Sequence, residues 1–290
     1  RSRSDVVIVG GGIIGSSIGY ALAKEGLSVT VLERDSIGNH ASGFALGLLN
    51  PTNDTGITES LVHQAFRMHQ SQLEQVQEES GVDAQVQTLP HLELALEESE
   101  ITVLKSEVDR INSLPNFKAT WLKPNEIKKL EPRLTEQLYG GVLVEDVIIL
   151  DSYNLTLATA QAAKVRGAKF ILKEATGIVY ESNRANAVMM GEDRIDCDVV
   201  VLALGPWSGA SSLWLDIDIP IVPQKGEIVR VEGLEPSLGI HVHGSPLGHS
   251  CSVVQKSDGA TWLAATVKED TGFDATPSAE ALELLSLRSI

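Results

Sequence analysis

Cysteine, aromatic residues and long apolar runs are all scarce in this sequence. The two cysteines, Cys197 and Cys251, form neither a C-x-x-C motif nor a metal-ligand pattern, so we expect two buried free thiols and no metal site. No apolar run approaches the roughly 20 residues that a membrane-spanning helix needs. These absences argue against a disulfide scaffold and a transmembrane segment, and they predict a soluble protein of the cytoplasm or an organelle lumen.

Basic residues are also few. The 39 acidic residues outnumber the 23 basic ones, and the net charge of −16 argues against a surface that binds nucleic acid or an anionic membrane. We therefore expect a small molecule as the partner, whereas the sequence does not address the oligomeric state. The first residue is Arg1 and not a methionine, so a targeting segment cannot be judged from this sequence.

A glycine-rich turn near the start of the chain organises what is present. Residues 6–9 are a β-branched run typical of a strand buried on both faces, and Gly10, Gly12 and Gly15 then form G-x-G-x-x-G. Gly10 permits a tight turn, Gly12 lets a pyrophosphate approach the backbone, and Gly15 lets the following helix lie close to the strand. The free N–H groups and the dipole at the start of that helix favour phosphate charge.

The helix and the strand after this turn complete a nucleotide-binding βαβ pattern. Helical spacing predicts a buried helix face made of Ile14, Ile18, Ala21 and Leu22. Gly26 is a suitable helix end, and the next strand ends on Glu33. Glu33 follows the last motif glycine by 33 − 15 = 18 residues, near the spacing of about 20 expected for a carboxylate on a ribose hydroxyl. The carboxylate disfavours NADP but does not separate NAD from FAD.

Two further segments extend the predicted nucleotide site. Residues 34–51 are small, glycine-rich and poorly periodic, which predicts an ordered loop that enters a short helix. Such a loop can lay backbone N–H groups against a second phosphate and a flat ring. The apolar strand at residues 199–204 ends in Gly205 at the start of a helix, and ligands in open α/β sheets bind at such carboxyl ends.

The order of the elements predicts an α/β protein with two domains, for which 290 residues are enough. Nucleotide-binding strands fall within residues 1–85 and 151–212. The strands of residues 86–150 and 213–290 predict a second, mainly antiparallel α+β domain inserted into this Rossmann-like domain. Within residues 241–249, the three histidines are interpreted as polar residues of a loop.

Taken in order, these motifs resemble the D-amino-acid-oxidase-like (DAO) family of FAD-dependent oxidoreductases, and most of all its glycine oxidase and sarcosine oxidase branch. The resemblance covers nearly the whole chain and rests on six segments: residues 9–15, 33–34, 41–49, 201–208, 223–227 and 256–266. The first segment is shared with many dinucleotide-binding proteins, whereas the ordered set is much more specific.

The resemblance implies FAD as the cofactor, bound in an extended form. Residues 13–14 would lie by the pyrophosphate, Glu33 on the adenosine ribose, residues 41–42 on the phosphates and residues 46–48 on the isoalloxazine ring. The backbone near Gly177 would meet adenine, and residues 203–205 would pass the ribose. The residues assigned to FAD in this way are Gly10, Gly12, Ile13, Ile14, Gly15, Glu33, Arg34, Ala41, Ser42, Leu46, Gly47, Leu48, Gly177, Ala203, Leu204, Gly205 and Trp207.

The resemblance further implies an enzyme that oxidises the C–N bond of a small amino acid or secondary amine, such as glycine, sarcosine or a D-amino acid, by hydride transfer to flavin N5. Leu48 and Ser252 would line the substrate pocket, although the glycine oxidase branch carries a tyrosine at the position of Ser252. The arginine that binds the substrate carboxylate, and a second glycine-rich strip over the flavin, would lie beyond Ile290. We therefore expect a C-terminally truncated chain that lacks the last part of the FAD domain and has weak or no activity, with its catalytic residues unassigned.

Two alternatives stay open at this point. Oxidation of a C–O bond in a 2-hydroxy acid or a glycerol phosphate would need a general base, and His241, His243 and His249 are candidates for it. A non-catalytic flavin-binding protein is the third hypothesis. Flavin reduction by candidate substrates would distinguish the three.

Overall fold

The computed structural model describes residues 2–53 and 56–288. The chain forms two compact units. The first unit comprises Arg1–Gly47, Arg67–Gln85 and Asp151–Pro223, and the second comprises Leu48–Phe66, Val86–Leu150 and Gln224–Ile290. Residues 48–66 and 213–223 thus fall on the other side of the division from the predicted boundaries.

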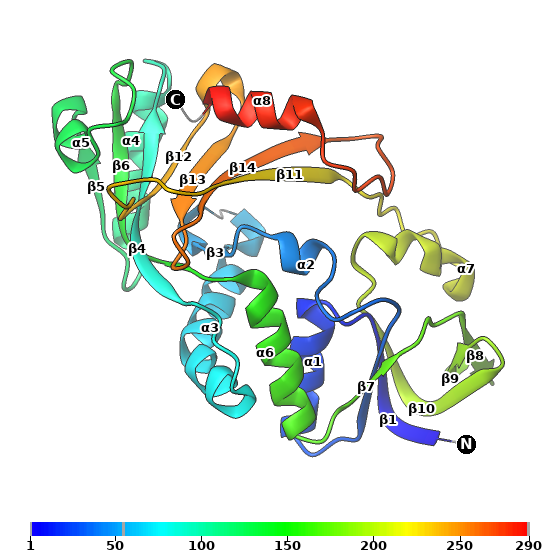
Figure 1. The fold of residues 1–290 in the computed structure, drawn as a ribbon. Coiled ribbons are helices and arrows are strands. Elements are labelled where there is room, and N and C mark those ends of the chain that lie inside the picture. The colour runs from blue at the N-terminus through cyan, green and yellow to red at the C-terminus, as the bar shows by residue number, and fades with distance from the viewer. Residues whose placement is uncertain (1, 54–55, 289–290) are drawn as a thin grey trace. The chain divides into compact units, whose positions relative to one another are not determined.

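The first unit is built on a six-stranded sheet in which β1 has a central place (Figure 1). In spatial order the strands are β7 (Lys169–Leu172), β2 (Val29–Glu33), β1 (Ser2–Val9), β10 (Asp193–Leu202), β9 (Arg184–Met190) and β8 (Gly177–Glu181). The first four are parallel, and β9 and β8 continue the sheet antiparallel. Val7 and Ile8 of β1 are fully buried, as the β-branched run predicts for a strand covered on both faces.

Helices α1 (Ile13–Lys24) and α6 (Ser152–Val165) pack against each other in this unit, side by side in Figure 1. The helix α3 (Glu59–Ser80) adds its residues from Arg67 onward. Small side chains of α6, among them Ala158 and Ala162, join Val6 and Ile8 in one core cluster.

The predicted buried face of α1 is confirmed for Ile18 and Leu22, which are partly buried and pack against the core cluster, and is wrong for Ile14 and Ala21. Ile14 is 63% exposed and Ala21 is also exposed, whereas the buried residues are Gly15, Ser16, Gly19, Tyr20 and Ala23. A Cβ atom on Gly19 would lie only 3.2 Å from Cγ2 of Val31, so at this position the helix lies too close to the sheet for a larger side chain. Close packing therefore selected the small residues, which an argument from hydrophobic spacing alone does not anticipate.

The remaining helices of the first unit are short. The segment after β2 enters α2 (Ala41–Phe44), as predicted for an ordered loop and a short helix. After β10, a 3-10 turn (Gly205–Ser211) leads into α7 (Ser212–Leu215). Asp151 caps α6, because its Oδ1 accepts a hydrogen bond of 2.7 Å from the backbone N–H of Asn154.

The second unit is built on an eight-stranded sheet. Its path is β11 (Lys225–Val231), β14 (Thr261–Lys268), β13 (Cys251–Gln255), β12 (His241–Gly244), β4 (Gln87–Ala95), β6 (Gly140–Ile149) and β3 (Leu48–Leu49), and β5 (Ala119–Leu122) also pairs with β6. Every pair is antiparallel except β12 with β4. The helices are α4 (Glu100–Ser113), α5 (Pro124–Leu130) and α8 (Ala279–Arg288). The α/β class with a mainly antiparallel second sheet is confirmed.

The loop predicted around the histidines is wrong for two of the three. His241 and His243 lie on β12, where they pair with His91 and Glu93 of β4. A strand of four residues with two polar side chains carries little local signal, and its partner lies about 150 residues earlier in the chain. His249 follows a 3-10 turn (Pro246–Gly248) and is exposed.

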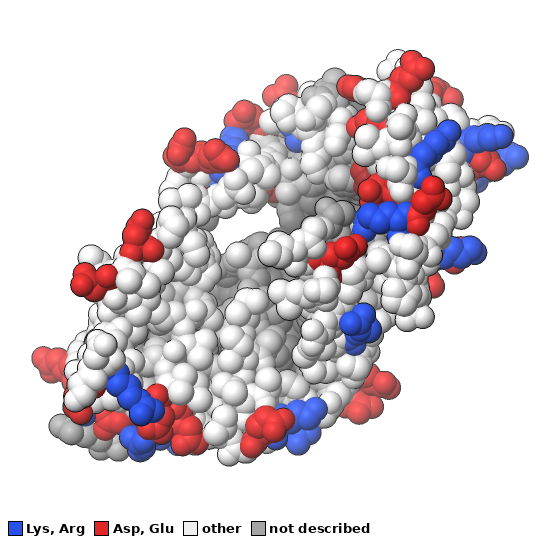
Figure 2. Space-filling model, turned by 180° about the vertical axis from the view of Figure 1, so that it is seen from behind, with Lys and Arg blue, Asp and Glu red and all other residues white. Residues whose placement is uncertain are grey.

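Charged side chains of opposite sign lie beside one another on the face shown in Figure 2. Over the whole described surface, ion pairs include Arg3 with Asp198 at 2.7 Å, Lys118 with Glu145 at 2.9 Å, and Arg166 with Glu79. Both cysteines are buried free thiols, as predicted. Across residues 2–53 and 56–288, no helix combines the length and the apolar character needed to cross a membrane, and no group of side chains forms a metal site.

Candidate functional site

The turn between β1 and α1 is held in a geometry that only glycine permits at two of its positions. Gly10 has φ +112°, and a Cβ atom there would lie 2.2 Å from the carbonyl oxygen of Ala203. A Cβ atom on Gly15 would lie 1.9 Å from the carbonyl oxygen of Gly10. Gly10 is therefore packed closely against the chain at the end of β10 and against Gly15 of α1.

Glu33 stands at the carboxyl end of β2 and binds two backbone amides. Its Oε2 accepts a hydrogen bond of 2.7 Å from the N–H of Gly11, and its Oε1 accepts one of 2.9 Å from the N–H of Asp35. Each carboxylate oxygen has a further lone pair, so the group can still accept from a ligand hydroxyl. Glu33 also lines the cavity described next.

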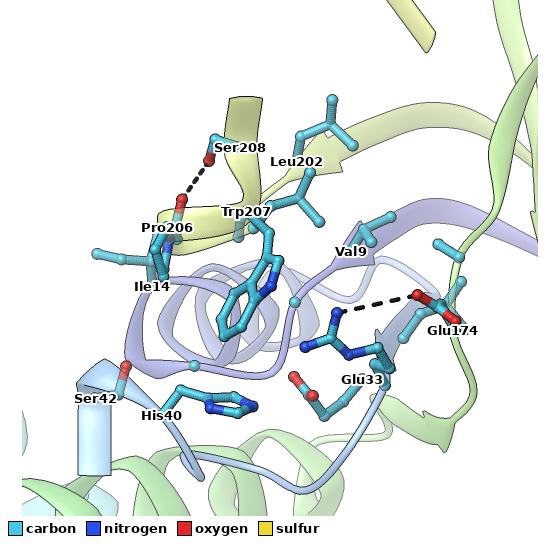
Figure 3. Close-up of a pocket in the computed structure, with 18 of the residues that line it drawn as sticks. Val9, Ile14, Glu33, His40, Ser42, Glu174, Leu202, Pro206, Trp207 and Ser208 are labelled. Carbon is cyan, nitrogen blue, oxygen red and sulfur yellow. Dashed lines mark hydrogen bonds and ion pairs between the residues drawn. The ribbon is translucent and has the colours of Figure 1, made fainter. Parts of the chain in front are cut away.

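A cavity of about 410 Å³ lies within the first unit, at the carboxyl ends of β1, β2 and β10 (Figure 3). Of the residues assigned to the cofactor from the sequence, eleven line it: Gly10, Gly12, Ile14, Glu33, Arg34, Ala41, Ser42, Ala203, Leu204, Gly205 and Trp207. The structure therefore brings together four segments that lie up to about 200 residues apart in the chain.

The first turn of α1 faces Ser42 of α2. The backbone N–H of Ile13 donates to Oγ of Ser42 at 3.0 Å, and a Cβ atom on Gly12 would meet that same oxygen at 2.9 Å. The first N–H groups of a helix have no partner within the helix, so an acceptor at this place satisfies them. The end of α1 that lines the cavity is thus set up for oxygen acceptors.

An aromatic stack forms one wall of the cavity and was missed in part by the sequence analysis. The guanidinium of Arg34 lies 4.7 Å from the ring centroid of Trp207, and the ring of His40 meets the same indole edge-on at 4.6 Å. Figure 3 shows the indole and the imidazole next to each other in the cavity. Arg34 and Trp207 were assigned to the site, whereas His40 sits in a loop whose sequence gives no sign that the ring would turn inward.

Asp35 fixes the position of that wall. Its Oδ2 accepts from His40 Nε2 at 2.7 Å and from the Arg34 side chain at 3.2 Å. These two hydrogen bonds, that from His40 being the larger influence, lower the pKa of Asp35. Arg34 also faces Glu174 at 4.0 Å. The cation over the indole is therefore balanced by two carboxylates.

Six residues assigned to the cofactor do not line this cavity. Ile13 and Gly15 both belong to the first turn of α1. Gly177 begins β8, two residues beyond Ala175, which does line the cavity. Leu46 and Gly47 follow α2 in the first unit, while Leu48 lies on β3 of the second unit. The roles assigned to these residues, and to Ser252 on β13 of the second unit, stay predictions.

A second cluster of polar side chains lies on the sheet of the second unit. Nδ1 of His91 and Nδ1 of His241 are 2.7 Å apart, and both residues are at most 1% exposed. Burial, together with the charge of the neighbouring histidines, lowers the pKa of His241 to about 3. Nδ1 of His243 bonds both oxygens of Glu93, at 2.7 and 2.8 Å.

Glu93 links these histidines. Burial acts to raise its pKa, but the hydrogen bond from His243 and the nearby imidazole of His91 outweigh burial and bring the pKa to about 2. Glu93 is therefore ionised at neutral pH. Of the three histidines proposed as bases, His241 is neutral and fully buried, so only His243 and His249 can meet solvent or a ligand.

Comparison with known proteins gives the same family along the whole chain. Residues 5–288 match the family described as DAO, FAD dependent oxidoreductase. A glycine oxidase from Bacillus licheniformis is 27% identical over 273 residues, which cover 92% of this chain and 71% of that protein. The crystal structure of glycine oxidase from Geobacillus kaustophilus superposes with a TM-score of 0.92 at 28% identity, over 100% of this chain and 78% of that one. L-proline dehydrogenase from P. horikoshii gives a TM-score of 0.87 at 25% identity, over 99% and 76%. The chain belongs to the DAO family of FAD-dependent oxidoreductases.

Proposed function

We propose that this FAD-dependent oxidoreductase oxidises the C–N bond of a small amino acid or secondary amine. The likeness to proteins named for glycine and L-proline, over more than nine-tenths of the chain, carries the proposal. Both named substrates are small amines that bear a carboxylate. The cavity of the first unit supplies the cofactor site that such a reaction requires.

The residues around the cavity fit the nucleotide part of FAD. Gly12 has no side chain where a diphosphate would approach, and the first turn of α1 offers N–H groups to phosphate oxygens. Glu33 keeps lone pairs for a ribose diol after it has bound two amides. Arg34 and Trp207 offer flat faces against which an aromatic base can stack.

FAD, when bound, would supply the redox chemistry of the reaction as the acceptor of a hydride from the carbon next to the amine nitrogen. The side chains and backbone of this chain have other tasks. Residues 10–15 hold the nucleotide with backbone groups, whose positions are fixed by the close contacts of Gly10 and Gly15. Anchoring of the nucleotide would help to position the cofactor against the substrate, and positioning can supply several kcal/mol of the barrier reduction.

Anaerobic mixing of the FAD-loaded protein with candidate substrates tests the proposal. The panel contains glycine, sarcosine, proline and several D-amino acids, together with a 2-hydroxy acid and glycerol 3-phosphate. We expect slow loss of the oxidised flavin band, in keeping with the weak activity expected from the sequence, with at least one amine and with neither of the hydroxyl compounds. Reduction by the hydroxyl compounds alone, or by none of the panel while dithionite reduces the flavin, would contradict the proposal.

A further inference from the structure

Three side chains of the second unit form a hydrogen-bonded series that the proposed function does not use. Ser250 Oγ lies 2.9 Å from Nε2 of His243, and Nδ1 of the same imidazole lies 2.7 Å from Oε2 of Glu93. A hydroxyl, an imidazole bonded through both nitrogens, and a carboxylate are the parts of an activated serine, which is recognised by geometry and not by position in the chain. The distances fall within the range for nucleophile and base, and for base and orienting group.

The protonation states of this series follow from the contacts. Glu93 is ionised and can only accept, so the proton of a neutral His243 must sit on Nδ1. Nε2 then carries a lone pair, and it accepts the hydrogen bond from the Ser250 hydroxyl. This is the tautomer in which the imidazole can take a proton from the serine.

The carboxylate of Glu93 has a further contact with the buried histidine pair. Nε2 of His91 approaches Oε2 of Glu93 at 3.4 Å, and His91 is bonded to the buried His241. The paired strands β4 and β12 put His91 beside His241 and Glu93 beside His243 in register. A base is better oriented when its partner carboxylate has further contacts, so the buried histidine pair makes the series rigid.

Ser250 is open to reagents. It is exposed, and it lies between the 3-10 turn and the start of β13. The side chain of His243 is 24% exposed, enough to exchange a proton with a bound molecule or with water. We propose that Ser250 is an activated nucleophile that accepts acyl groups from activated esters. Because an activated ester has a good leaving group, its acyl transfer depends chiefly on the nucleophile and its base.

The transfer step balances without any further reactant. Oγ of Ser250 forms a bond to the acyl carbon while its proton passes to Nε2 of His243. The bond between the acyl carbon and the leaving oxygen then breaks, and that oxygen takes the proton from His243. Water, activated by the same nitrogen, hydrolyses the acyl-serine to release the acid and restore the hydroxyl.

Labelling of the FAD-loaded protein with a biotin-tagged fluorophosphonate tests the proposal. The serine oxygen would displace fluoride and give a stable adduct, which peptide mass spectrometry locates. We expect adduct at Ser250, and p-nitrophenyl acetate should compete with the labelling. His243→Gln should slow labelling by about 100-fold or more, the lower end of what a general base contributes. Glu93→Gln should slow it by about 10-fold or more, because the imidazole loses its fixed tautomer.

Ser245→Ala is the matched control, since Ser245 lies in the same loop and belongs to neither site. It should label like the wild type, and Ser250→Ala should lose the adduct. Far-UV circular dichroism and flavin content show that each variant is folded. Equal labelling of Ser245 and Ser250, no adduct at Ser250, or labelling of Ser250 that is unchanged in folded His243→Gln would overturn the proposal.

Discussion

The turn that begins α1 and the histidine cluster on β4 and β12 are two polar sites built in opposite ways. The turn presents backbone groups to the cavity, and its glycines have no side chains. The cluster is held together by hydrogen bonds between side chains, and its backbone is ordinary sheet. The turn therefore depends on space that must stay empty, whereas the cluster depends on partners that must stay present. Substitutions should harm the first by adding atoms and the second by removing them.

The largest effect is expected where an added atom meets fixed backbone. Gly10→Ala would place a methyl group 2.2 Å from the Ala203 carbonyl, which cannot withdraw because the Ala203 N–H donates to Val9 at 2.8 Å. Strain at positive φ and overpacking together should lower the free energy of unfolding by about 3 kcal/mol or more, with loss of FAD. Gly26→Ala is the control, because φ is +84° but no atom lies within 4 Å of the added carbon. It should cost about 1 kcal/mol. Urea unfolding measures both, and equal losses would refute the role of the close contact.

Gly12→Val should spare the fold and remove the cofactor. The nearest atom to a Cβ atom there is the hydroxyl of Ser42, which can rotate away, so far-UV circular dichroism should change little. The valine would fill the space through which a diphosphate approaches. We expect FAD to bind at least about 100-fold more weakly, equal to about 2.8 kcal/mol. Titration of apoprotein with FAD, followed by flavin fluorescence, measures it, and wild-type affinity would show that the diphosphate lies elsewhere.

The cluster should respond to removal of one partner more than to removal of both. His241→Leu leaves Nδ1 of the buried His91 without its partner, which should lower the free energy of unfolding by about 2 kcal/mol. The double variant His91→Leu/His241→Leu replaces both polar groups by apolar ones and should recover at least half of that loss. Urea unfolding of four proteins, the wild type, His91→Leu, His241→Leu and the double variant, decides it. A double variant that loses the sum of the two single losses would show that the pair is not coupled.

The smallest effect is a slope with pH. The pKa of His241 is about 3 when folded, below the ordinary value of 6.5, so between these values the unfolded chain binds a proton that the folded chain does not. Stability is thus full above about pH 6.5 and falls toward pH 3, by about 1 kcal/mol per pH unit. Glu93, with a pKa of about 2, adds to the fall below pH 4.5.

The difference between wild type and His241→Leu isolates this contribution. Burial also lowers the pKa of His69, but that residue is unchanged in the variant and cancels from the difference. Thermal or urea unfolding at steps from pH 7.5 to 5 should show a shallower slope for His241→Leu. Parallel slopes would mean that the pKa of His241 is the same in the folded and the unfolded state.

The same contrast explains what the sequence could predict. Residues 6–15 and Glu33 were assigned correctly to a strand, a turn and a strand end. These assignments rest on local preferences, because β-branched residues favour strands and glycine permits the tight turn. The burial predicted for Ile14 and Ala21 of α1, and the loop predicted in place of strand β12, were wrong, because both depend on partners distant in the chain. Gly19 is buried because Val31 lies against it, and His241 is in a strand because β4 lies beside it. The position of His40 in the cavity wall likewise depends on a distant residue, Trp207, which its ring contacts.

Glu33 has a consequence for anyone who would redesign the nucleotide preference of this chain. The carboxylate that lines the cavity also accepts hydrogen bonds from the amides of Gly11 and Asp35, so it connects two loops as well as standing in the predicted nucleotide site. Exchange for a neutral or basic residue would release both loops at once. Even aspartate, one methylene shorter, could not span the two amides from the same backbone position. A change of nucleotide would thus require the loops to be rebuilt together with the residue, which leaves few single steps open to evolution or to the engineer.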